Sequence, residues 1–202
     1  MSESPLLSAR GLSLERGGRE LFTGLDFSAL PGRLVLIEGE NGAGKTSLLR
    51  ILAGLSRYGF EGTVERPERL LFIGHQSAVK GLLTPRENLA WHSDGLADCS
   101  DEVIEQALQQ VGLHGYEDVP AHTLSAGQHR RVNLARLYLP IDVSLWLLDE
   151  PFTAIDRQGV ARLEDHFAQH IAAGGAIVMT SHQALRLTSG VIKFSLSKGL
   201  MP

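Results

Sequence analysis

The segment from Gly39 to Thr46 reads Gly-Glu-Asn-Gly-Ala-Gly-Lys-Thr, which has the spacing of a phosphate-binding loop. An uninterrupted apolar run over residues 34–37 ends just before it, and leucines and isoleucine recur at helical spacing from Lys45 onward. A strand, a glycine-rich turn and a helix therefore follow one another in the order that such a loop requires. This order predicts an α/β fold in which the helix N-terminus and its backbone N–H groups face a phosphate.

Each part of this loop has an expected task on a nucleoside triphosphate, which we take to be ATP with Mg²⁺. Lys45 supplies positive charge to the β and γ oxygens. The Thr46 hydroxyl holds Mg²⁺, and Ser47 reaches the α-phosphate. The residues expected to bind nucleotide in this segment are Gly39, Asn41, Gly42, Ala43, Gly44, Lys45, Thr46 and Ser47.

An acidic pair, Asp149 and Glu150, follows a second apolar run over residues 145–148. A carboxylate at this strand end would face the loop, so Asp149 is expected to position Mg²⁺. Glu150 is the candidate general base that polarises the attacking water. Taken alone, the pair could equally cap a strand end on the surface; the phosphate loop upstream favours the catalytic interpretation.

The segment Leu124 to Gln128 reads Leu-Ser-Ala-Gly-Gln and predicts a second helix start suited to phosphate. It lies too far along the chain to continue the first loop. The economical explanation is a head-to-tail homodimer, in which Ser125, Gly127 and Gln128 of each subunit cover the nucleotide of the other. A plain N-cap is the alternative, which accounts for Ser125 but not for the glycine and glutamine.

Three more polar residues are candidates by position. Gln76 follows an apolar run at residues 70–73 and could touch Mg²⁺ or the attacking water, unless it is a surface glutamine. His182 follows the strand expected at residues 176–180 and could reach the γ-phosphate and hold Glu150. Asp156 lies six residues after Glu150 and could sit where two subunits meet, cap a helix, or do both.

The remaining pattern predicts alternating strands and helices, hence a parallel sheet covered on both faces. An amino-terminal hairpin is expected from strands 12–15 and 21–29, and a capping box at Thr84 to Glu87 opens a helix. The block of about residues 77–140 is interpreted as a helical insertion in one domain spanning 1–202. The other expected elements are strands 34–37, 70–73, 144–148, 176–180 and 191–196, and helices 101–111, 125–139 and 158–172.

Composition narrows the setting. The 202 residues carry a net charge of −4, which argues against a protein built to hold nucleic acid. The single cysteine, Cys99, and the absence of a signal-peptide pattern predict a cytoplasmic location. No apolar run approaches the roughly 20 residues that cross a bilayer, so a membrane role must come through partners. His166 and His170 could hold a metal, but a surface helix is the preferred interpretation.

These motifs, in this order, resemble the nucleotide-binding subunits of ATP-binding cassette (ABC) proteins over essentially the whole chain. The stretches 73–76, 83–89, 124–132, 146–156 and 180–183 are most similar to the ATP-binding subunits of cytochrome c maturation, the haem exporter A or CcmA family. This resemblance implies an amino-terminal antiparallel β subdomain, a RecA-like parallel-sheet core and an inserted helical signature subdomain. It also implies a peripheral ATPase on the cytoplasmic side of the bacterial inner membrane, docked on separate integral membrane subunits.

In that family hydrolysis serves haem export or the release of a haem-loaded chaperone. The chain has no Cys-x-x-Cys-His pattern, so direct haem ligation is not expected. Two other functions stay open: a soluble ABC-type regulatory switch, and a small-molecule phosphotransferase, which would leave Leu124 to Gln128 unexplained.

One departure concerns the nucleobase. ABC domains usually stack adenine on an aromatic residue at the position that aligns with Arg16 here. A guanidinium can also stack on a base, and Phe22 lies nearby in the sequence. We therefore expect only a modest preference for ATP over GTP.

Overall fold

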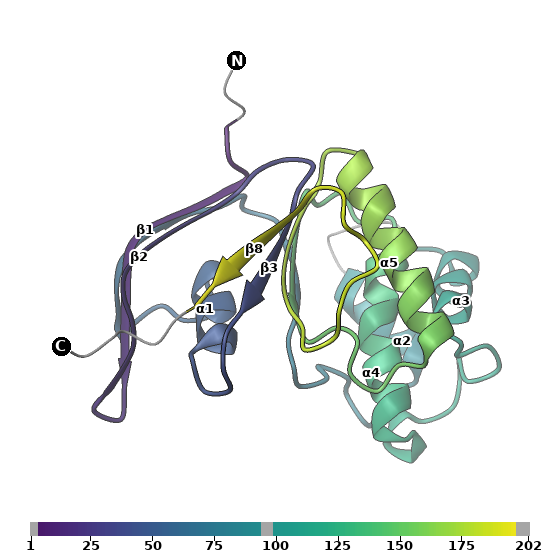
Figure 1. Cartoon of the computed structure of the whole chain (residues 1–202). Coiled ribbons are helices and arrows are strands. Elements are labelled where there is room, and N and C mark those ends of the chain that lie inside the picture. Colours follow the sequence, from purple (N-terminus) through teal and green to yellow (C-terminus); the bar gives the residue numbers. More distant parts are fainter. Residues whose placement is uncertain (1–3, 94–98, 197–202) are drawn as a thin grey trace. The chain divides into compact units, whose positions relative to one another are not determined.

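A computed structural model describes residues 4–93 and 99–196 of the chain (Figure 1). It divides into two compact units. Unit 1 takes the described residues of Met1–Phe72, Val143–Pro151 and His166–Pro202. Unit 2 takes those of Ile73–Asp142 and Phe152–Asp165. The boundaries show that unit 2 is formed by two insertions into the chain of unit 1.

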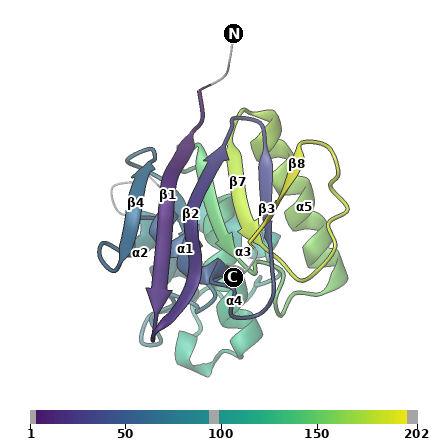
Figure 2. The ribbon, with the colours of Figure 1, turned by 60° about the vertical axis from the view of Figure 1, so that its left-hand side comes forward.

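An antiparallel sheet forms the amino-terminal part of unit 1, with strand order β2-β1-β4 (Figure 2). Its strands are β1 (Leu7–Arg16), β2 (Arg19–Ala29) and β4 (Phe60–Glu65). The expected hairpin is confirmed, and Gly17 and Gly18 turn the chain with φ of 60° and 72°. Strand β4 was not predicted from the sequence, because four of its six residues are exposed and leave little apolar alternation.

A second sheet has five strands in the order β5-β6-β7-β3-β8, and all of its strand residues except Ile73 belong to unit 1. Its strands are β3 (Leu34–Glu38), β5 (Leu71–Ile73), β6 (Leu145–Asp149), β7 (Ala176–Thr180) and β8 (Val191–Ser195). The β3–β7, β3–β8 and β6–β7 pairs are parallel. Every residue of β6 and β7 is buried, which explains why these segments are continuous apolar runs in the sequence.

Helix α1 (Lys45–Leu52) packs against β6 and β7. Its apolar face, Leu48, Leu49, Ile51 and Leu52, belongs to one core cluster with side chains from the antiparallel sheet and from β3, β6 and β7. Burial of this face fixes the helix start at the end of β3, where the phosphate loop lies.

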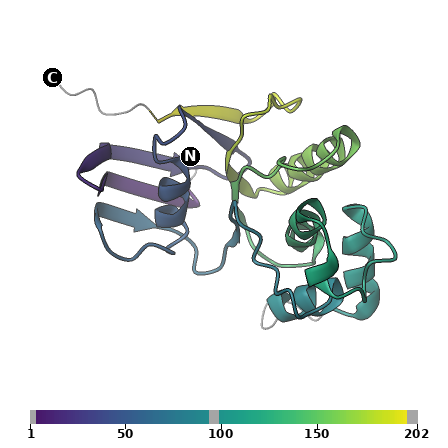
Figure 3. The same cartoon turned by 90° about the horizontal axis from the view of Figure 1, so that it is seen from below.

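Unit 2 contains α2 (Pro85–Ser93), α3 (Asp101–Gln110) and α4 (Ala126–Ala135), which contact one another (Figure 3). Single 3-10 turns lie at Ala121–Thr123 and Arg136–Tyr138, so the helix expected to reach residue 139 changes its winding after Ala135. The capping box is confirmed: the Thr84 N–H donates to Glu87 Oε2 at 2.8 Å, and the Glu87 N–H donates to Thr84 Oγ1 at 3.2 Å.

Helix α5 (Arg157–Ala172) continues from unit 2 into unit 1. In unit 1 the His170 ring stacks on Trp146 with centroids 3.8 Å apart, and His166 lies 5.3 Å from the same indole. Both histidines are half-buried, and their imidazoles cover a tryptophan of β6. Among the helices in the described ranges, none is long and apolar enough to span a membrane.

Candidate active site

The phosphate loop connects β3 to α1 in unit 1 and needs glycine at two positions for space. A Cβ on Gly39 would lie 2.6 Å from the Leu196 carbonyl oxygen, and one on Gly44 would lie 3.3 Å from the Phe22 ring. Gly44 also has φ of 100°, a left-handed conformation that side chains rarely adopt. The loop backbone is thus held close to β2 and to the segment after β8.

The Lys45 ammonium lies across this loop. It donates to the Gly39 carbonyl at 2.6 Å and to the Glu40 carbonyl at 3.2 Å. A bound phosphate would offer the ammonium anionic acceptors instead of neutral carbonyls, and such charge-assisted hydrogen bonds are the stronger ones. The expected contact of Lys45 with the β and γ oxygens stays a prediction.

Asp149 ends β6 with only 2% of its surface exposed. Thr46 Oγ1 donates to its Oδ2 at 2.8 Å, and Thr180 Oγ1 donates to its Oδ1 at 2.7 Å. The Thr46 hydroxyl and the Asp149 carboxylate are oxygen ligands at the start of α1, which is the ligand chemistry that Mg²⁺ prefers. These two residues, both expected from the sequence to hold the metal, lie together in the structure.

Glu150 has an unusual backbone, with φ of 50° in the left-handed region. Its N–H donates to Thr180 Oγ1 at 2.9 Å, and its Oε2 accepts from the His182 N–H at 3.2 Å. The His182 Nε2 lies 3.5 Å from Glu150 Oε1. Strained conformations of this kind persist only where neighbours hold them and are common at functional sites.

Thr180 was missed by the sequence analysis as a site residue. Its fully buried hydroxyl accepts from Glu150 and donates to Asp149, so it fixes both carboxylate residues from the adjacent strand β7. The signal was present in the sequence, because a hydroxyl residue ends the otherwise apolar run 176–179.

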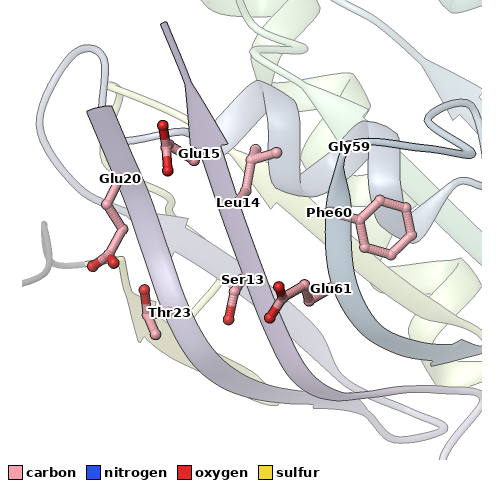
Figure 4. A pocket seen from close by; sticks show the side chains of 8 residues that line it. All are labelled: Ser13, Leu14, Glu15, Glu20, Thr23, Gly59, Phe60 and Glu61. Carbon is pink, nitrogen blue, oxygen red and sulfur yellow. The ribbon is translucent and has the colours of Figure 1, made fainter. Parts of the chain in front are cut away.

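Two cavities open on the antiparallel-sheet side of unit 1. One, of about 460 Å³, carries Glu15, Glu20 and Glu61 on β1, β2 and β4 (Figure 4). Its three carboxylates disfavour a triphosphate. The other, of about 310 Å³, is lined by Ser47 of α1 and by Arg16, so the structure brings these two expected nucleotide contacts to one cavity.

The signature segment lies in unit 2, where Ser125 is the N-cap of α4. The Ser125 N–H donates to Gln128 Oε1 at 2.8 Å, and the Gln128 N–H donates to Ser125 Oγ at 3.2 Å. This reciprocal capping box corrects one step of the sequence argument: an N-cap does explain Gln128, because the glutamine side chain closes the box.

Gly127 remains unexplained by helix capping. A Cβ at this position would lie 3.6 Å from the Ala154 carbonyl oxygen, which is ordinary van der Waals contact. The chain itself therefore has room for alanine at 127. Asp156, two residues after Ala154, caps α5 by accepting from the Gly159 N–H at 2.7 Å, as one interpretation of the sequence expected.

The loop that carries Gln76 is tied to α4 within unit 2. The buried Arg130 donates to the Gly74 carbonyl at 2.5 Å, and Ser77 Oγ donates to the His129 carbonyl at 3.2 Å. The Gln76 side chain is exposed. Its expected contact with metal or water stays a prediction, while the attachment of its loop to the signature helix is an observed feature.

The site defines a P-loop nucleoside triphosphatase. Its features are a phosphate loop, a buried aspartate hydrogen-bonded to the threonine after the lysine, and a glutamate at the end of the same strand. Comparison with known proteins narrows this class. The family model described as ABC transporter matches residues 22–153. Two similar solved structures share the fold: a putative ABC transporter ATP-binding protein from Pyrococcus furiosus (21% identity, 93% of this chain and 96% of that chain, TM-score 0.76), and a dimeric post-hydrolysis state of the ATP-binding cassette MJ0796 (19%, 88% of both chains, TM-score 0.76).

Curated relatives are much closer in sequence. A protein of Pseudomonas syringae pv. tomato is 49% identical and covers 96% of this chain and 97% of its own. One of Yersinia pestis is 50% identical, covering 91% and 89%. Both are named cytochrome c biogenesis ATP-binding export protein CcmA. The chain belongs to the ABC transporter family and, within it, to this CcmA group; it is an ATPase, which binds ATP and hydrolyses it to ADP and phosphate.

Proposed function

We propose that this chain is the ATP-hydrolysing subunit of an ABC complex in cytochrome c biogenesis, peripheral on the cytoplasmic side of the bacterial inner membrane. Identity of about half the residues over nearly the full length of the CcmA relatives supports this proposal. Separate integral membrane subunits would couple ATP hydrolysis by this chain to a conformational change. That change would export haem or release a haem-loaded chaperone, and this chain would perform no chemistry on haem.

The proposed chemistry at the γ-phosphate belongs to Glu150, and the hydrogen bonds around this residue carry the proposal. Its backbone is fixed through Thr180, and its carboxylate is held by the His182 N–H. A carboxylate restrained from both sides can take the proton of a water aligned with the γ-phosphate. His182, whose imidazole lies beside the same carboxylate, would orient Glu150 and contact the phosphate.

The residues that bind the phosphates and those that would bind the metal have separate tasks in this scheme. Lys45 and the N–H groups at the start of α1 bind the phosphate oxygens and orient them for in-line attack. Thr46 and Asp149 would hold Mg²⁺, with Gln76 as a further ligand or a water contact. Bound there, Mg²⁺ neutralises charge that develops on the phosphate oxygens.

The second half of each site would come from another copy of the chain, in a head-to-tail homodimer. Ser125 and Gly127 open a helix whose N-terminus suits phosphate, and the space at Gly127 is not needed by the chain itself. The γ-phosphate of a nucleotide bound to the other copy would occupy that space, which would explain why residue 127 is glycine. In this arrangement Asp156 would lie at the boundary between the two subunits.

The base assignment is tested with Glu150→Gln, which removes the basic carboxylate while keeping size and polarity. We expect ATP binding close to that of the parent chain and turnover reduced at least about 100-fold, the usual effect of losing a general base. Glu68→Gln, at an exposed position, is the matched control. Parental turnover by Glu150→Gln would show that another group takes the proton.

The biological role is tested by complementation. The chain is expressed in a bacterium that lacks its own CcmA, and covalent haem in c-type cytochromes is measured. We expect rescue by the parent chain and none by Glu150→Gln expressed at the same level. Absence of rescue by an ATPase-active parent chain would favour the soluble regulatory switch over the membrane complex.

A further inference from the structure

The sequence identifies residues for the phosphate end of the nucleotide site but few for the nucleobase end. One cavity in unit 1 is the candidate for the nucleobase end. Thr46 and Ser47 are neighbours on α1, so their side chains point about 100° apart around the helix axis. The Thr46 hydroxyl faces Asp149, where the γ-phosphate end would lie in the proposed site. Ser47 instead lines the cavity of about 310 Å³, whose lining also includes Glu15.

This cavity leads from Ser47 to two side chains that suit a flat ring. Arg16 lines it from the end of β1, and Tyr58 lines it from the segment between α1 and β4. Its volume lies at the lower end of the range for small-molecule sites, which fits a nucleoside better than a larger ligand. Ile51 of α1 and Phe60 of β4 supply apolar lining.

Tyr58 contributes nothing to the core that would explain an aromatic residue there. Its side chain is 91% exposed, the second most exposed of the large apolar and aromatic side chains that the structure describes. Gly59 follows with φ of 81° and turns the chain into β4, so the backbone sets the position of Tyr58. An exposed ring at the edge of a nucleotide cavity gains burial when a base covers it.

Arg16 has a matching peculiarity. It lies opposite Arg19 in the β1–β2 register, and like charges at facing positions destabilise a strand pair. In the part of the chain that the structure describes, neither guanidinium has an ion-pair partner. A guanidinium stacks well on aromatic planes, and a nucleotide would bring anionic charge toward this cationic pair.

We propose that Tyr58 and Arg16 together hold the purine base of the nucleotide. The Tyr58 ring would supply the aromatic stacking surface, because position 16, where ABC domains usually have an aromatic residue, is an arginine. The proposal deepens the nucleotide site described above and does not depend on the cytochrome c role. Stacking accepts any base with a π face, so ADP and GDP should bind with similar affinity.

The test compares ADP with inorganic pyrophosphate, which has the phosphates but no base, by titration calorimetry on the full chain. Base stacking lost to alanine should weaken ADP binding about 5-fold to 150-fold in Tyr58→Ala. Pyrophosphate binding should stay within about twofold, because the phosphate loop is untouched. Tyr58→Phe keeps the ring and should bind ADP like the parent chain.

Tyr116→Ala, at an exposed tyrosine of unit 2, is the matched control and should leave ADP affinity unchanged. Two results would overturn the proposal: parental ADP affinity in Tyr58→Ala, or an equal loss of ADP and pyrophosphate affinity, which would indicate a disturbed loop. Because ADP binding needs no partner chain and no membrane subunit, either result would leave the homodimer and the cytochrome c role standing.

Discussion

The hydroxyl of Thr180 offers the sharpest test of how the catalytic carboxylates are held. Valine has nearly the shape of threonine, so Thr180→Val removes the hydroxyl without opening a cavity. Two hydrogen bonds disappear: the 2.9 Å bond from the Glu150 N–H and the 2.7 Å bond to Asp149 Oδ1. The residue is fully buried, so water does not replace either bond.

The expected loss of stability follows from these two bonds. A hydrogen bond to a charged acceptor contributes about 1.5–3 kcal/mol, and a buried N–H left without an acceptor costs about 1–3 kcal/mol. Together they predict a decrease of about 2.5–6 kcal/mol in the free energy of unfolding. For a chain of this size that corresponds to a fall of roughly 5–24 °C in the unfolding midpoint.

Catalysis should suffer separately, because the strained backbone of Glu150 loses the hydrogen bond from its N–H to Thr180. Misplacement of a catalytic group by about 1 Å costs on the order of 100-fold. We therefore expect kcat to fall about 10- to 100-fold with KM for ATP nearly unchanged, measured by phosphate release below the midpoint of the variant.

Thr180→Ser is the control, since it keeps the hydroxyl and loses only a buried methyl group, worth about 1 kcal/mol. It should recover most of the lost turnover. If Thr180→Val unfolds at the parental temperature and hydrolyses ATP at the parental rate, the hydroxyl does not hold the two carboxylates.

Three further predictions address other parts of the molecule. Arg130→Met should release the Gln76 loop, which would be measured as faster hydrogen exchange at residues 74–77, and should lower ATPase turnover several-fold. Unchanged exchange would show that Arg130 does not hold this loop to α4. Burial lowers the pKa of His170 below its ordinary value, so the unfolded chain binds its proton more readily, and stability should fall as pH drops below about 6.5. His170→Phe, which keeps the stack on Trp146, should flatten that part of the unfolding profile. Gly127→Ala should unfold like the parent chain yet hydrolyse ATP at least about 10-fold more slowly; normal hydrolysis would remove the support for a partner's phosphate at this turn.

The strongly periodic and glycine-marked parts of the chain were predictable. Strand β3, the phosphate loop and α1 follow directly from an apolar run, a fixed glycine spacing and a helical repeat. The proximity of Asp149, Glu150 and His182 was predictable because each lies at or just after the end of a buried strand, and parallel strands bring such residues to one edge of the sheet. Local pattern and topology agree at these positions.

What escaped prediction depended on contacts between distant segments. Strand β4 exists because it pairs with β1, although its own residues are mostly exposed. The imidazole of His170 is placed by Trp146, which lies far away in the sequence. Thr180 gains its task only from Asp149 at the end of strand β6 and from Glu150 directly after it. Sequence patterns report which residues are buried, but not which distant polar groups those residues will meet.

The close approach of Leu196 to Gly39 has a practical consequence for anyone handling this protein. The Leu196 N–H also donates to the Glu38 carbonyl at 2.8 Å, so the segment after β8 braces the entrance to the nucleotide loop. Affinity tags and fluorescent fusions are therefore better attached at the amino end, and deletions that remove Leu196 should be judged first by their effect on nucleotide affinity.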